Sequence, residues 1–234
     1  MKIFFPKNFE PQKPIKIYDH HDIMVTFFCG TINPSQFNLV ILRELGIIPL
    51  DWQLEKPIIS KPELLQFSFK EGINIFIAIG KISFIIKKGS NYVDLQKIII
   101  RFIDKFNNYN WQKIQLNIRR LMSLPGSKDN GEKFMREILL NSDKWDILGL
   151  KPVKMQVTFH YPFLQNPLLI NITDIKVKTK ENKIKSGLLF RGTFHYALEL
   201  KSTINKINYL KLIINNFSKN IELFNTIIEK KFLV

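Results

Sequence analysis

The densest group of residues able to bind a metal ion is Asp19-His20-His21-Asp22. Imidazole and carboxylate groups are common ligands of transition metals. The group precedes an apolar run, residues 23–28, that predicts a strand. Because neighbouring side chains of an extended chain point to opposite sides, one ion could not easily take both histidines. We therefore expect a solvated turn that enters the strand, and we predict neither a metal site nor a cofactor.

Two histidines, His160 and His195, stand late in predicted strands, and a tyrosine follows each of them, Tyr161 and Tyr196. Histidine titrates near neutral pH, so a surface of histidine and tyrosine could do acid–base work. No carboxylate, cysteine or serine stands at a spacing that would complete a nucleophile–base pair. We predict no catalytic residue. An enzyme that uses His160 or His195 as its acid–base group remains an alternative.

A third group of residues is basic. Lys176, Lys178 and Lys180 alternate along a predicted strand, so they are expected to share one of its faces. The cluster continues into the next turn and strand with Lys183, Lys185 and Arg191. Such a hairpin could bind the phosphates of RNA or DNA, and three nearby aromatic side chains could stack on bases: Phe190, Phe194 and Tyr196. The alternative is a solvated sheet face whose aromatic rings point to the core.

The chain carries a net charge of +15 and has a pI near 9.8. Residues 1–110 hold 14 basic and 10 acidic side chains, whereas residues 111–234 hold 21 and 10. A basic protein attracts phosphate polyanions. However, 29 of the cations are lysine and only six are arginine, and asparagine and isoleucine are abundant. This composition is typical of AT-rich coding, which weakens the argument from net charge to a ligand.

Eight strands and four helices are expected. Alternation of apolar residues predicts strands over 23–28, 64–69, 73–79, 81–86, 112–121, 153–161, 168–178 and 186–199. Apolar spacings of three and four predict helices over 35–45, 92–106, 131–140 and from 202 to the C-terminus. Ser35 is the expected N-cap of the first helix. In the strand over 112–121, Ile114, Leu116, Ile118 and Arg120 share one phase.

Both halves of the chain have the same order of elements: strand, helix, three strands, helix. We predict an α+β fold of two such units with antiparallel sheets, closed by a long C-terminal helix. Residues 1–17 form an extended arm, residues 18–110 the first unit and residues 111–234 the second. The two units are expected to join or pack as one compact globule.

Three runs of sequence carry a resemblance: residues 45–54 (LGIIPLDWQL), 65–73 (LQFSFKEGI) and 189–196 (LFRGTFHY). They resemble an uncharacterised conserved reading-frame family of cyanobacteria and red-algal plastids. That family typically has Asn before the Phe-His pair, where this chain has Thr193. The resemblance implies a protein of the plastid stroma or the cyanobacterial cytoplasm, and it implies no activity.

Neither cysteine chemistry nor membrane insertion is expected. The single cysteine, Cys29, lies in an apolar run, so we predict a buried thiol. No stretch approaches the ~18 to 20 apolar residues of a membrane helix. Residues 1–14 resemble neither a secretory signal nor a transit peptide.

These patterns favour a non-enzymatic binding or accessory protein that acts on a macromolecular partner through a sheet surface. The first alternative is sequence-tolerant binding of RNA or DNA through the basic hairpin. The second alternative is the histidine-based enzyme. The sequence does not identify the protein partner.

Overall fold

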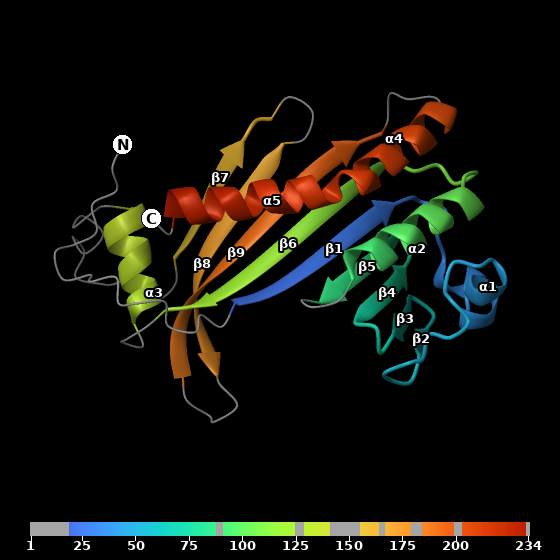
Figure 1. Ribbon diagram of the computed structural model, residues 1–234, viewed down its shortest axis with the longest axis horizontal. Helices are drawn as coiled ribbons and strands as arrows, with labels where there is room; N and C mark the ends of the chain where they lie inside the picture. The colour runs from blue at the N-terminus through green and yellow to red at the C-terminus, as the bar shows by residue number, and fades with distance from the viewer. Residues whose placement is uncertain are drawn as a thin grey trace.

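A single antiparallel sheet organises the protein. The computed structural model describes residues 19–87, 91–124, 129–140, 155–163, 167–178, 184–198 and 203–232. Its strands are β1 (Asp19–Phe28), β2 (Ile59–Lys61), β3 (Leu64–Ser68), β4 (Ile73–Ala78), β5 (Lys81–Lys87), β6 (Lys113–Ser123), β7 (Gln156–Tyr161), β8 (Leu168–Lys178) and β9 (Ile184–Ala197). They lie in the order β2-β3-β4-β5-β1-β6-β9-β8-β7 (Figure 1). The predicted α+β class with an antiparallel sheet is confirmed.

The two halves of the chain meet at the centre of this sheet. Strands β1 to β5 come from the first half and β6 to β9 from the second, and the pairing of β1 with β6 joins them. This pairing is antiparallel and runs from Asp19 opposite Met122 to Phe28 opposite Lys113. The core is therefore continuous from one half to the other. The predicted arm, residues 1–17, lies outside the described residues.

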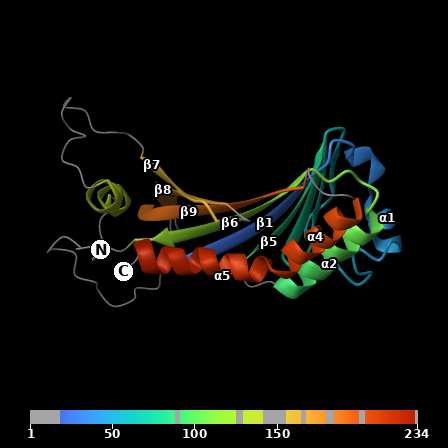
Figure 2. The same ribbon diagram turned by 90° about the horizontal axis from the view of Figure 1, so that it is seen from above.

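The helices lie on one face of the sheet, as Figure 2 shows for α2, α4 and α5. The helical elements are η1 (Pro34–Gln36), α1 (Leu39–Glu44), α2 (Tyr92–Lys105), α3 (Asn130–Lys133) with the π-helical turn η2 (Phe134–Leu139), α4 (Thr203–Asn215), α5 (Phe217–Ile227) and the π-helical turn η4 (Ile228–Phe232). Helices α2 and α4 lie side by side, where Gln96 Nε2 donates to the Ile214 carbonyl at 3.1 Å and Lys211 pairs with Asp104.

Strand periodicity decides which side chains face the helices. Along β6 the residues at even positions, from Ile114 to Met122, are buried, and those between them are partly or fully exposed. Arg120 belongs to the buried set, as its phase predicted, and its guanidinium donates to Asn225 Oδ1 at 3.3 Å and to Glu229 Oε1 at 3.1 Å. Asn225 lies near the C-terminal end of α5, and Glu229 lies in the turn η4 that follows it. The even phase of β6 therefore marks the helix-covered face.

The helix-covered face of the first half holds an aromatic cluster centred on Phe102 of α2. Its ring lies 4.6 Å from that of Phe106, 5.5 Å from Phe84 and 6.0 Å from Trp111, measured between ring centroids. Phe37, which follows η1, packs against the same ring. These contacts fix α2 on the sheet. Cys29 is buried beside this core, and its thiol lies 3.1 Å from the Thr31 hydroxyl.

The segment after β1 differs from its prediction. The structure has a short 3-10 turn capped by Asn33 and then the six-residue helix α1 capped by Asn38, so Ser35 is not the cap of one continuous helix. The two asparagine side chains accept hydrogen bonds from backbone N–H groups that a helix start leaves free. The Pro-containing link that follows contributes an unpredicted edge strand, β2.

The C-terminal helix is divided. A single long helix was predicted from Ser202, whereas α4 ends at Asn215 and α5 starts at Phe217. Asn216 lies between them with φ −101° and ψ 2°, and its side-chain amide donates to the Leu212 carbonyl at 2.9 Å. Asparagine competes for backbone hydrogen bonds in this way, which makes it a poor residue inside a helix. None of the helices in the described ranges is long and apolar enough to cross a membrane.

Candidate functional site

The second face of the sheet carries no helix among the described elements. We define the open face as the side chains of β1 and β5 to β9 that point away from α5. On β6 and β9 these are the odd-numbered residues, because even-numbered ones contact α5: Arg120 binds Asn225, and Gly192 lies under the Phe224 ring. The strand registers extend this assignment across the sheet, since paired residues of neighbouring strands point to the same face.

Two arginines lie side by side at the centre of the open face. Arg119 of β6 stands directly opposite Arg191 of β9. Arg119 also forms an ion pair with Asp22 of β1, and the side chains are 57% and 15% exposed respectively. Arg191 is exposed and has no ion pair among the described residues. Like charges opposite each other are unfavourable in a sheet, and one carboxylate neutralises only one of them. The pair is suited to share an anion.

Cations outnumber acidic side chains on the described part of the open face. Its cations, all exposed, are Lys81, Lys113, Arg119, Lys185 and Arg191. Asp22 is the only acidic side chain that the described part of this face contains. The cations come from three strands, β5, β6 and β9, that are distant in sequence. The fold therefore brings cations from distant parts of the sequence together on one face.

Phe28 gives the open face an aromatic ring between two lysines. It is half-buried on β1, opposite Lys113 of β6 and Lys81 of β5. The Lys113 ammonium lies 4.4 Å from the centroid of the ring, a cation–π contact.

Amide and hydroxyl side chains lie beside the charged groups on β6 and β9 and continue onto β8 and β7. The Thr193 hydroxyl donates to Asn117 Oδ1 at 3.0 Å, and Asn171 Nδ2 donates to the Thr158 hydroxyl at 3.0 Å. These bonds hold the side chains in fixed positions and leave further donor and acceptor capacity for a ligand.

His160 and His195 both lie on the open face but do not meet. His160 pairs in register with Leu169, which pairs with Thr193. The two histidines are therefore separated by two inter-strand spacings across the sheet and by two residues along the strands. From sheet spacings this is about 12 Å between their Cα atoms. Gln115 Nε2 lies 3.2 Å from His195 Nδ1, where its N–H can donate to a neutral ring. Burial, and then the charge of Lys113, lower the pKa of His195.

We expect the stability of the protein to fall at acidic pH through His195. Its pKa is lowered in the folded state, so its contribution is complete above 6.5, the ordinary value, and is lost as the pH falls towards the folded pKa, because the unfolded chain takes up the proton first. Urea unfolding at pH 7.5 and pH 5.0 tests this. The drop in unfolding free energy should be smaller in His195→Gln than in the wild type. An NMR titration that places the pKa of His195 at or above 6.5 would contradict it.

Tyr196 points away from His195. It lies on the helix-covered face, is buried, and its hydroxyl accepts a hydrogen bond from Asn220 of α5. Burial, and then the nearby Tyr209, raise the pKa of Tyr196 far above its ordinary value. The phenol therefore stays protonated, and the pair of residues does not form one acid–base surface.

The predicted basic hairpin is split between the two faces. Lys176 stands opposite Ser186 and Lys185 opposite Val177, so Lys176 lies on the helix-covered side while Lys185 and Arg191 lie on the open face. The backbone of Lys178 continues β8, and Lys180 and Lys183 lie outside the described residues. The rings of Phe190, Phe194 and Tyr196 are buried against the helices and cannot stack on bases. The alternative prediction, that these rings point to the core, is correct.

The cluster from Asp19 to Asp22 is part of a strand and not a turn. Asp22 lies on the open face and His21 on the helix-covered face, because adjacent residues alternate. Across the residues that the structure describes, no three His, Cys, Asp or Glu side chains come together in a way that could hold a metal ion.

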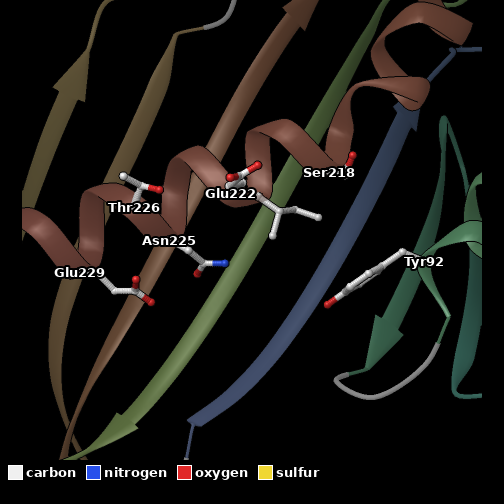
Figure 3. Close-up of a pocket in the computed structure, with 7 residues that line it drawn as sticks. Tyr92, Ser218, Glu222, Asn225, Thr226 and Glu229 are labelled. Atoms are coloured by element: carbon white, nitrogen blue, oxygen red, sulfur yellow. The ribbon is translucent and has the colours of Figure 1, made fainter.

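A groove on the other side of the sheet separates α5 from the start of α2 (Figure 3). Tyr92 lies across this groove from α5, and its hydroxyl points into the groove. The remaining lining residues come from α5 and η4: Ser218, Ile221, Glu222, Asn225, Thr226 and Glu229. Asn225 and Glu229 bind the buried Arg120. The fold already uses these two side chains, and we assign no ligand to the groove.

Comparison with known proteins gives no family: no protein-family model and no curated protein matches the sequence. The geometry of the open face is therefore the basis for a function. Sequence reasoning singled out Lys185, Arg191 and both histidines but missed Lys81 and Lys113. The alternation of Arg119 with apolar residues along β6 could have predicted that its side chain is exposed. Its position opposite Arg191 could be found only from the strand register.

Proposed function

We propose that the chain is a non-enzymatic binding protein that contacts a macromolecular partner through the open face. One observation carries the proposal: this face brings together five exposed cations and one acidic side chain from four strands. Antiparallel sheets often expose one polar face to water, but such faces usually mix both signs of charge. A strong excess of one sign attracts partners of the opposite sign.

Site-specific photo-crosslinking tests this proposal. A photoreactive amino acid at Asn171, on the open face, should give discrete adducts of defined mass in cells that express the protein. The same probe at Leu212, which is 56% exposed on α4, is the control and should give none. Equal labelling from the two positions, or adducts from Leu212 alone, would contradict the proposal.

We also propose that the two halves are structurally related units. The sheet order supports this: reading outward from the centre, β1-β5-β4-β3 on one side corresponds to β6-β9-β8-β7 on the other. The antiparallel β1–β6 pair is compatible with a pseudo-twofold axis through the middle of the sheet. In this arrangement α2 corresponds to the α4–α5 pair, and β2 is an addition to the first unit.

The family resemblance leads to one further proposal. We propose that the chain belongs to the conserved reading-frame family of cyanobacteria and red-algal plastids. The basis is the resemblance of the runs over 45–54, 65–73 and 189–196. The protein would then work in the plastid stroma or the cyanobacterial cytoplasm.

A further inference from the structure

We propose that the partner of the open face is a single-stranded nucleic acid, bound through its phosphates by the Arg119–Arg191 pair and through a base by Phe28. This inference rests on the proposed binding function of the same face. It keeps Lys185 and Arg191 of the predicted basic hairpin and joins them to residues of β1, β5 and β6.

The arginine pair provides the centre for a phosphate. The guanidinium of arginine is planar and presents several N–H donors in a fork that matches phosphate oxygens. The two side chains start from directly paired positions on β6 and β9, so one phosphate can contact both. Such an anion would reduce the repulsion between the two arginines, because the ion pair with Asp22 neutralises Arg119 but not Arg191. Lys185, exposed on the same face of β9 six residues from Arg191, can contact a phosphate further along the nucleic acid.

The ring of Phe28 provides a stacking platform. Base stacking on aromatic side chains beside a cationic groove is the usual way to bind single strands without sequence preference. Phe28 lies between Lys81 and Lys113, and the Lys113 ammonium occupies the position over its ring that a base would take. On binding, the base replaces the ammonium, and Lys113 turns to the adjacent phosphate.

The dimensions agree with a short single strand. From the arginine pair to Phe28 and Lys81 the path covers six residues along the strands and up to three strand steps across the sheet. Sheet spacings make this about 24 Å. That length accommodates a few nucleotides, at the lower end of the ~4 to 16 nucleotides that sheet-based modules contact.

The neutral groups favour a nucleic acid over an acidic protein. Asn117, Asn171 and Thr193 offer amide and hydroxyl groups beside the cations, and these suit base edges and 2′-hydroxyls. A carboxylate-rich partner would use the cations but would gain nothing from the half-buried ring of Phe28.

Fluorescence anisotropy with a labelled 12-nucleotide single-stranded RNA of mixed sequence tests the inference. Four phosphate contacts predict that affinity falls about 50-fold between 50 and 200 mM salt, and the double variant Arg191→Glu/Lys185→Glu should reduce this to about sevenfold. Phe28→Ala should weaken binding at every salt concentration without changing the salt slope.

Lys176→Glu/Lys219→Glu is the matched control. It makes the same charge change at two exposed lysines away from the open face, on β8 and α5. It should retain the wild-type salt slope and stay within about threefold of wild-type affinity. Circular dichroism of each variant checks that the fold is retained.

Three results would overturn the inference: no binding of the RNA at 50 mM salt, equal losses in the control and the open-face variants, or stronger binding of poly-glutamate than of the RNA. If RNA does not bind but Asn171 still gives specific adducts in cells, the proposed binding face stands and only its nucleic-acid partner is wrong. If neither experiment succeeds, both proposals fail.

Discussion

Replacing Phe102 by alanine should lower the free energy of unfolding by about 3 to 5 kcal/mol, the largest loss we expect from a single substitution. Phe102 is 1% exposed, and its ring contacts those of Phe37, Phe84, Phe106 and Trp111. Phe84 belongs to β5, Phe37 follows η1, and Phe106 and Trp111 lie between α2 and β6. The neighbouring rings cannot collapse into the space without moving α2 away from β5. Urea-induced unfolding followed by tryptophan fluorescence measures the change.

Val93→Ala is the control for this prediction. Val93 lies on the same helix but is 50% exposed, and alanine is the better helix former. Its unfolding free energy should stay within about 0.5 kcal/mol of the wild type. A loss below about 1 kcal/mol for Phe102→Ala would mean that the aromatic cluster does not hold α2 on the sheet.

Replacing Gly192 by alanine should cost about 2 to 3 kcal/mol, because the added methyl group has no room. A Cβ atom at this position would lie 2.5 Å from Cδ2 and 2.7 Å from Cε2 of Phe224. Phe224 is fully buried, so its ring can move only if α5 moves. The substitution should therefore also raise hydrogen exchange of the α5 amides more than that of α2.

Gly30→Ala serves as the comparison for Gly192→Ala. A Cβ atom there would have only Gln112 Nε2 as a neighbour, at 4.0 Å, and Gly30 has no positive φ. Its effect should be close to zero or slightly stabilising, since alanine restricts the unfolded chain. If Gly192→Ala unfolds at the same urea concentration as Gly30→Ala, α5 does not pack against β9 as closely as described.

Local patterns in the sequence predicted most strands of this protein. For several elements they also predicted which side chains are buried. Alternation along β6 separated Arg120 from Arg119, and the structure buries the first and exposes the second. Apolar spacing predicted the helix over 92–106, and the buried residues of α2, from Leu95 to Ile103, recur at these spacings of three and four. These predictions succeed because periodicity of 2 or 3.6 is a property of the chain segment itself.

The candidate site was harder to predict because it depends on register. Alternation correctly separates Lys176 from its neighbours, but it cannot state which phase of β8 matches which phase of β9. The structure fixes that match: Lys176 pairs with Ser186, and Lys185 with Val177. A shift of one residue would have put all these lysines on one face. The meeting of Arg119 with Arg191, 72 positions apart, is likewise a tertiary property.

The position of the β1–β6 pair has a consequence for how the chain folds. Strands β3 to β5 and β7 to β9 are joined to their neighbours in sequence, so these two groups can form from contacts close in the chain. The central pair instead joins residues such as Asp22 and Arg119, which are 97 positions apart. Closing so long a loop has an entropy cost that must be met before the strands gain any contact, and such contacts slow folding. We therefore expect the two outer meanders to form early and the middle of the sheet to close last, with α5 docking across it only after that step.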